Sequence, residues 1–250
     1  MRTEISRVSV NQNRPTVSKW RRDRPFVVGL MLIVSAIIFT GFARTYYLNA
    51  FFARRPLTLP LHLHGFLFSA WFVLLFVQIA LIAKRRTDLH RRVGYLGALV
   101  AFSMLIVGIN VSIHAAKYGS PAKPAGMSVA KFLAVPLFDL IVFGVLAGAG
   151  LYYRRKPQIH RRLMILATLG ILTAGLVRVP LEFTRNRDIS TIFLMGDIFA
   201  LVYIAYDTLT HKRLHPACLF GGLLIVLSVP LRFAIDDTLV WQAFTTWLVR

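Results

Sequence analysis

The chain is 250 residues long, 56% hydrophobic and 16% charged, with a mean hydropathy of +0.62. This composition is too apolar for a large soluble domain and indicates an integral membrane protein. The 30 Lys and Arg residues outnumber the 10 Asp and Glu residues, which gives a formal net charge of +20. Because the basic residues alternate with apolar blocks, loop charge explains them better than nucleic-acid binding, and we expect no nucleic-acid partner. The single cysteine, Cys218, excludes an internal disulfide framework and any CxxC metal or redox motif.

Apolar segments long enough to cross a bilayer, about 20 residues each, follow a basic arm over residues 1–25. The arm does not resemble a secretory signal. The predicted spans are Phe26–Ala43, His62–Ala83, Val93–His114, Ala130–Tyr153, Leu163–Phe183, Thr191–Thr210 and Ala217–Ile235. The last segment, Thr238–Arg250, is rich in aromatic residues and too short to cross, which predicts an interfacial helix. The sequence therefore predicts an all-α polytopic bundle of about seven transmembrane helices over residues 26–237, flanked by the arm and by the C-terminal helix at 238–250.

Lys and Arg residues concentrate in alternate connections between the predicted spans. The basic arm has seven of them, residues 84–92 have five, residues 154–162 have five, and residues 212–213 have two. Short loops rich in Lys and Arg stay on the cytoplasmic side of a membrane. The pattern therefore predicts a cytoplasmic N-terminus and a C-terminus on the opposite, outer side.

The predicted cytoplasmic connections contain a recurring motif. RRTDLHRR ends at Arg92, RRKPQIHRR ends at Arg162 and HKRLHP ends at Pro216, so that His90, His160 and His215 each precede a span. A duplicated hairpin is the simplest explanation, which predicts three related helical hairpins after the first helix. These helix starts should lie at the depth of the lipid phosphates, where anionic headgroups would bind Arg91, Arg92, Arg161 and Arg162. The alternative is a metal or haem site formed by the three His, which the surrounding positive charge disfavours.

Polar side chains within the spans gather toward the predicted outer face. They are His62, His64, Asn110, His114, Asp139, Arg178, Glu182, Asp197 and Arg232. An ionisable group within a membrane costs about 2.5 to 3.5 kcal/mol on insertion scales, so we expect these groups to face the interior and to be paired or hydrated. Asp139 and Arg178 belong to one predicted hairpin, and Asp197 and Arg232 belong to the next. The sequence therefore predicts an ion pair within each of these hairpins.

Three interpretations of this outer group remain open. The residues could tie neighbouring helices together, at about 0.6 kcal/mol per hydrogen bond. They could line a pocket that binds or passes a small molecule, lipid or metal ion, in a receptor, carrier or accessory subunit of other membrane proteins. They could also hold a metal or haem b, with His64 and His114 as axial ligands and Arg178 or Arg232 facing a propionate, as in a b-type electron-transfer protein. Since GxSxG, HExxH, phosphate-loop and GxGxxG motifs are absent, the sequence leaves open whether the protein is catalytic.

The motifs LHLHG at 61–65, DLHRR at 88–92 and RLHP at 213–216, together with VPLRF at 229–233, resemble a family of bacterial multi-pass inner-membrane proteins. The resemblance covers nearly all the predicted spans and implies a location in the bacterial inner membrane. The family brings no assigned activity, so no functional residue is carried over from it. The hairpins are also loosely similar to the cytochrome b561 class, which places paired His within the membrane on both sides. Here His90, His160 and His215 lie in Arg-rich helix starts instead, which departs from that pattern.

Overall fold

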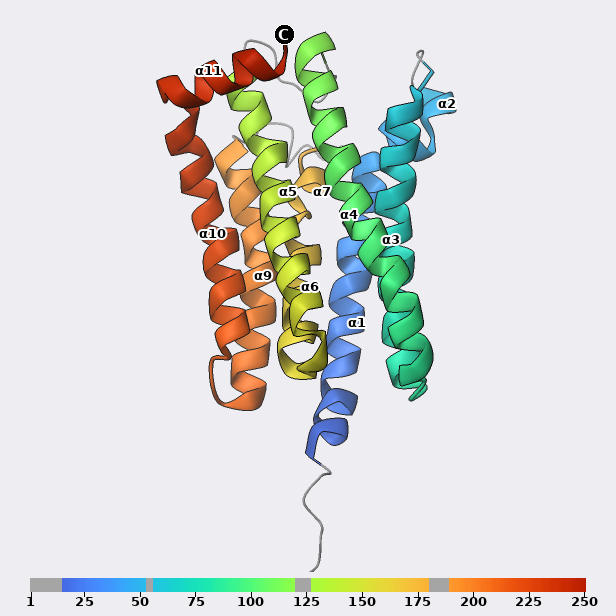
Figure 1. Ribbon diagram of the computed structural model, residues 1–250. Coiled ribbons are helices and arrows are strands. Elements are labelled where there is room, and N and C mark those ends of the chain that lie inside the picture. Colours follow the sequence, from blue (N-terminus) through green and yellow to red (C-terminus); the bar gives the residue numbers. More distant parts are fainter. Residues whose placement is uncertain (1–14, 53–55, 120–126, 180–188) are drawn as a thin grey trace, which may run out of the picture.

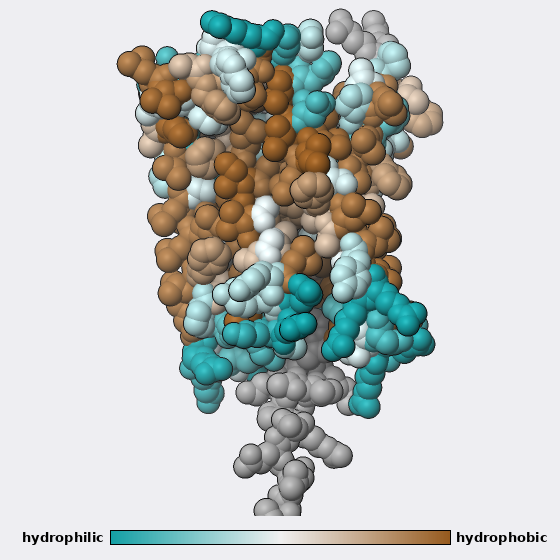
Figure 2. Space-filling view, viewed as in Figure 1, coloured by the Kyte–Doolittle hydropathy of each residue, from teal (hydrophilic) through white to brown (hydrophobic). Residues whose placement is uncertain are grey.

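The computed structural model describes residues 15–52, 56–119, 127–179 and 189–250, and these residues form helices and connections without a strand. Seven of the helical segments in these ranges are long and apolar enough to cross a membrane. They stand side by side in alternating directions (Figure 1). On the face that Figure 2 shows, a broad apolar band lies between two ends that carry hydrophilic residues. The predicted all-α polytopic bundle is confirmed, and the chain is a multi-pass integral membrane protein.

The first part of the chain forms α1 (Pro15–Phe42), a π-helical turn η1 (Ala43–Tyr47), α2 (Asn49–Phe52), α3 (Leu59–Ala83) and α4 (Thr87–Tyr118). The second part forms α5 (Val129–Tyr152), the short 3₁₀ turn η2 (Tyr153–Arg155), α6 (Pro157–Gly170), α7 (Thr173–Leu176), α9 (Ile189–His211), α10 (Pro216–Asp236) and α11 (Leu239–Leu248). Consecutive long helices pack together as α3 with α4, α5 with α6, and α9 with α10. We call the end that holds the first turns of α4, α6 and α10 the lower end, and the end crossed by α11 the upper end (Figure 1).

Local sequence chemistry explains where several helices begin. Pro60, Pro157 and Pro216 occupy the first turns of α3, α6 and α10. Proline is suited to this position because a backbone N–H there has no helical partner. The side chains of Ser128 and Thr238 cap the N-termini of α5 and α11 by accepting a backbone hydrogen bond. These residues therefore fix the positions at which the five helices begin.

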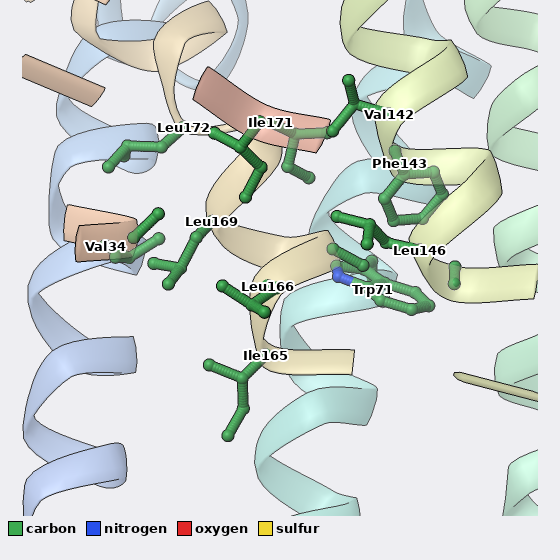
Figure 3. Close-up of a cluster of buried hydrophobic side chains, with 14 of the residues drawn as sticks. Val34, Trp71, Val142, Phe143, Leu146, Ile165, Leu166, Leu169, Ile171 and Leu172 are labelled. Carbon is green, nitrogen blue, oxygen red and sulfur yellow. The ribbon is translucent and has the colours of Figure 1, made fainter. Parts of the chain in front are cut away.

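The fifth span differs from its prediction. The sequence predicts a single helix over Leu163–Phe183, but α6 begins earlier and ends at Gly170, and a tight turn at Ile171 and Leu172 separates it from α7. Glycine weakens a helix, and Gly170 lies directly before this break. The helix α6 is surrounded by other helices. Figure 3 shows its apolar side chains meeting those of α1, α3 and α5. The residues labelled in this core are Val34, Trp71, Val142, Phe143, Leu146, Ile165, Leu166 and Leu169, together with Ile171 and Leu172 of the turn after α6.

Gly41 of α1 lies against α7 without room for a side chain. A Cβ at this position would overlap the backbone carbonyl oxygen of Gly175. We expect Gly41→Ala to lower the free energy of unfolding by about 2 kcal/mol, because a backbone atom cannot move aside as a flexible side chain can. Thermal unfolding in detergent measures the effect. The matched control is Gly29→Ala in the same helix, since nothing lies within 4 Å of a Cβ there. Equal stability of the two variants would contradict the close approach of α1 to α7.

Candidate functional site

A buried ion pair in the upper half of the bundle joins Asp139 of α5 to Arg232 of α10. Nη1 of Arg232 donates to Oδ1 of Asp139 at 2.9 Å, and the two side chains are 3% (Arg232) and 10% (Asp139) exposed. Arg232 also donates from Nε to the backbone oxygen of Ser228 at 3.2 Å and from Nη2 to the hydroxyl of Ser228 at 3.0 Å. Its guanidinium carbon lies 4.1 Å from the centre of the Phe193 ring. These contacts hold the guanidinium in one orientation.

This pairing corrects the sequence-based prediction, in which Asp139 pairs with Arg178 and Asp197 pairs with Arg232. That prediction is wrong because it assumes that polar groups meet only within a hairpin. In the structure α10 packs along α5 as well as along α9. Arg232 therefore reaches across to the preceding hairpin and binds Asp139.

Asp197 and Arg178 have no opposite charge within ion-pair distance among the residues that the structure describes. Asp197 on α9 is 8% exposed and interacts electrostatically with Arg232 and Asp139. Arg178, which follows α7, donates to the backbone oxygen of Ala174 at 2.6 Å and lies over the Phe42 ring at 4.7 Å. It also interacts electrostatically with Asp139. We call Asp139, Arg178, Asp197 and Arg232 the upper site. Within the described ranges it combines one ion pair with one carboxylate and one guanidinium that have no counter-charge at ion-pair distance.

The other residues predicted for this site divide into two groups. His64 on α3 lies near the upper site, because it interacts electrostatically with Arg178, and its Nδ1 is buried without a hydrogen-bond partner. His62, Asn110 and His114 are exposed. Glu182 lies outside the described residues. The structure thus places His64 near the predicted charges, whereas the side chains of His62, Asn110 and His114 lie on the surface of the bundle.

The haem interpretation requires His64 and His114 to face one another. In the structure His64 packs on Phe68, with 4.3 Å between ring centres, while the exposed His114 packs on Tyr118 at 4.6 Å. Within the described ranges no three His, Cys, Asp or Glu residues are grouped so that they could hold a metal ion. This geometry gives no support to a haem b held by these two His.

A second group of charges, which sequence analysis does not identify as a site, lies at the lower end between α1, α6 and α9. We call Asp23, Arg161, Arg162, Asp207 and His211 the lower cluster. Nε of Arg162 donates to Oδ2 of Asp207 at 2.8 Å, and Nη1 of Arg161 lies 3.1 Å from Oδ2 of Asp23. His211 has its Nε2 3.5 Å from Asp23 and its Nδ1 3.5 Å from Asp207. These charges connect three helices that are far apart in the sequence.

The lower cluster corrects part of the lipid-headgroup prediction. The side chains of Arg161 and Arg162 are only 16% and 2% exposed, and they pair with buried carboxylates instead of facing headgroups. The sequence of an Arg-rich helix start does not show whether its side chains face lipid headgroups or the bundle interior. The headgroup prediction is therefore wrong for Arg161 and Arg162. The one available signal is Asp207, a carboxylate inside an apolar span. Arg91 and Arg92 are exposed, and headgroup binding remains a prediction for them.

His215 has a local structural role at the start of α10. Its Nδ1 accepts a hydrogen bond from the backbone N–H of Ala217 at 3.1 Å, which caps the helix. Burial, together with the nearby charge of Arg162, lowers the pKa of His215 below its ordinary value. This shift favours the neutral imidazole, the form that can accept this hydrogen bond. The role of His215 as a helix cap therefore distinguishes it from His90 and His160, the other two His of the repeated motif.

Comparison of the chain with protein-family models, with curated proteins and with solved structures found no match. The upper site is therefore interpreted from its own chemistry. An unpaired charge in an apolar environment is costly, and it attracts a group of opposite charge. The upper site has one such position for an anion and one for a cation.

Proposed function

We propose that this membrane protein binds a small zwitterionic molecule at the upper site, as a receptor or carrier. The observation that supports this proposal is that Arg178 and Asp197, two oppositely charged side chains beside an ion pair, have no ion-pair partner among the described residues. Each unpaired ionisable group costs roughly 2.5 to 3.5 kcal/mol when it is placed in a membrane. An occupant that carries both charges would compensate both costs at once.

Each residue of the upper site has a distinct role in this proposal. Arg178 binds the anionic group of the occupant, a carboxylate or phosphate, through charge-assisted hydrogen bonds. Asp197 binds the cationic group. Asp139 and Arg232 neutralise one another and hold α5 against α10 as a fixed wall. The unpartnered Nδ1 of His64 offers a further polar contact. A free zwitterion and the headgroup of a zwitterionic lipid share this chemistry.

We also propose that the lower end faces the cytoplasm of a bacterium and that the upper site opens toward the outer side of the inner membrane. The connections at 84–92, 154–162 and 212–213, which carry most of the loop Lys and Arg residues, all lie at the lower end (Figure 1). Basic loops of this kind remain cytoplasmic. The occupant would then reach Arg178 and Asp197 from outside the cell or from the outer leaflet.

Thermal unfolding of the protein in dodecyl maltoside, with phosphoethanolamine as the probe, tests the proposed function. Because a ligand that binds only the folded state stabilises it, we expect phosphoethanolamine to raise the unfolding midpoint of the wild type. Arg178→Gln and Asp197→Asn each remove one charge at similar volume, so both should lose most of this increase. Inorganic phosphate and ethanolamine, which each carry charge of one sign only, should stabilise the wild type less than phosphoethanolamine does.

The control variant is Asp88→Asn, which changes an exposed carboxylate at the opposite end of the bundle and should leave the increase unchanged. Reconstitution into vesicles with and without phosphatidylethanolamine distinguishes a lipid headgroup from a free zwitterion. The proposal would be contradicted if phosphoethanolamine and phosphatidylethanolamine both left the wild type unstabilised, or if they stabilised both charge variants equally with it.

A further inference from the structure

Several buried side-chain atoms near the lower end have no hydrogen-bond partner among the described residues, and two of them lie between α3 and α4. These two are Oε1 of Gln78 on α3 and Nδ1 of His90 on α4. The two residues are neighbours, because the backbone of Gln78 lies close enough to the His90 ring to influence it. In addition, the side-chain amide nitrogen of Gln78 would lie 3.6 Å from a Cβ at Gly94, one turn after His90. Buried polar atoms are almost always paired, so this pair of atoms indicates a missing partner.

His160 of α6 provides a third lone pair at the same place. Its ring centre lies 6.3 Å from that of His90, and the two ring planes are at 85°. Nδ1 of His160 lies 2.7 Å from the carbonyl oxygen of Gly150. Because a carbonyl only accepts, Nδ1 carries the hydrogen, which leaves the lone pair of the neutral ring on Nε2. A backbone carbonyl bound to the other ring nitrogen is the usual way in which a metal-binding His is oriented.

The distance between the two rings matches that of two imidazoles on one metal ion. A ligating nitrogen lies about 2 Å from its metal and about 1.2 Å from its own ring centre, so two such ring centres lie about 5 to 6.5 Å apart. The observed 6.3 Å is near the upper limit of this range, where the two nitrogens lie on nearly opposite sides of the ion. A wide angle of this kind leaves one side open for a third donor, which Gln78 can provide.

The charges around this position allow a cation to bind. Arg161 and Arg162, which follow His160 directly, are neutralised by Asp23 and Asp207 of the lower cluster. Arg91, next to His90, is exposed, and solvent screens its charge. The objection that basic residues repel a cation, which the sequence alone raises, is therefore weakened by the ion pairs.

The three donors carry no charge, and this favours an ion of low charge. Burying a divalent ion among neutral donors costs more than burying a monovalent one, because desolvation increases with charge. Copper is well suited to imidazole ligands. We propose that His90 and His160, with the side-chain oxygen of Gln78 as a third donor, bind one Cu⁺ ion between α3, α4 and α6. The site is independent of the upper site and of its proposed zwitterion.

Competition with the chromogenic chelator bicinchoninate, under anaerobic reducing conditions in detergent, tests this proposal. We expect the wild type to hold one Cu⁺ ion per chain. Loss of an outer-shell partner alone costs about 10- to 100-fold in affinity, so His90→Ala and His160→Ala should each weaken binding by at least about 100-fold. Gln78→Leu should weaken binding less than either of them. The matched controls are His62→Ala at the upper end and His215→Asn, in which Asn can replace the helix cap, and both should bind Cu⁺ as the wild type does.

Size-exclusion elution and far-UV circular dichroism show whether each variant is folded. If an alanine variant does not fold, His90→Gln or His160→Gln is measured in its place. The X-ray absorption spectrum of the copper-loaded protein should contain two imidazole ligands. The proposal would be overturned if the wild type held no Cu⁺ or if His90→Ala bound it equally well. Preferential binding of Zn²⁺ at these His would overturn the assignment of a monovalent ion. A haem spectrum that depends on His90 would assign the pair to haem instead and would also overturn it.

Discussion

Asp207→Asn is expected to lower the free energy of unfolding by about 3 to 5 kcal/mol, because it leaves a buried Arg162 guanidinium without its counter-charge. Arg162 is 2% exposed and keeps hydrogen bonds of 2.8 and 2.9 Å to the backbone and side chain of Gln158. These neutral acceptors do not replace the lost charge. Unfolding by SDS in mixed micelles, followed by circular dichroism, measures the effect.

Asp88→Asn is the matched control for this variant. Asp88 also pairs with an arginine, Arg86, but the two side chains are 60% and 56% exposed. Exposed ion pairs contribute little, so we expect no measurable change in stability. If Asp207→Asn were as mild as Asp88→Asn, Arg162 would not be a buried ion that depends on Asp207.

Asp139→Ala is expected to have an effect of similar size, about 3 to 5 kcal/mol, because it leaves Arg232 buried and unpaired. A double-mutant cycle identifies the partner. Asp139→Ala combined with Arg232→Leu should be clearly less destabilising than the sum of the two single variants, since the second change removes the uncompensated charge. The same cycle with Arg178→Leu should be closer to additive, because Arg178 forms no ion pair with Asp139 among the described residues. Additive losses for Asp139 and Arg232 would contradict their contact.

The number and approximate positions of the spans could be predicted from the sequence because an apolar run is a local property. The break between α6 and α7 could not, since Gly170 and Ile171 lie within a continuous apolar segment and only the surrounding helices decide how the chain continues there. The position of α6 at the centre of the bundle is likewise a result of packing. A hydropathy pattern does not distinguish a span that faces lipid from one that is enclosed by other spans.

The candidate residues were predictable to the extent that each one is conspicuous in its own segment. Asp139, Asp197 and Arg232 are ionisable groups inside apolar runs, and the structure buries all three. Their partners were not predictable, because pairing depends on which helices pack together. Most of the lower cluster gives no signal in the sequence, because Asp23 and Arg161 lie at span ends, where charge is expected in any membrane protein, and only Asp207 lies within an apolar span. Similarly, the repeated motif groups three His, whereas the structure uses His215 as a helix cap and places only His90 and His160 together.

The connection between Arg162 and Asp207 has a consequence for how the chain is assembled during synthesis. The two residues are 45 positions apart, and the ribosome makes the arginine first. Until the later helix has been translated, the fifth span carries an arginine whose carboxylate partner does not yet exist. In the interval, Asp207 does not yet replace water or lipid headgroups around Arg162, and the hydrogen bonds to Gln158 are the local contacts of Arg162. A ribosome stalled before residue 207 would therefore leave Arg162 without its final ion-pair partner.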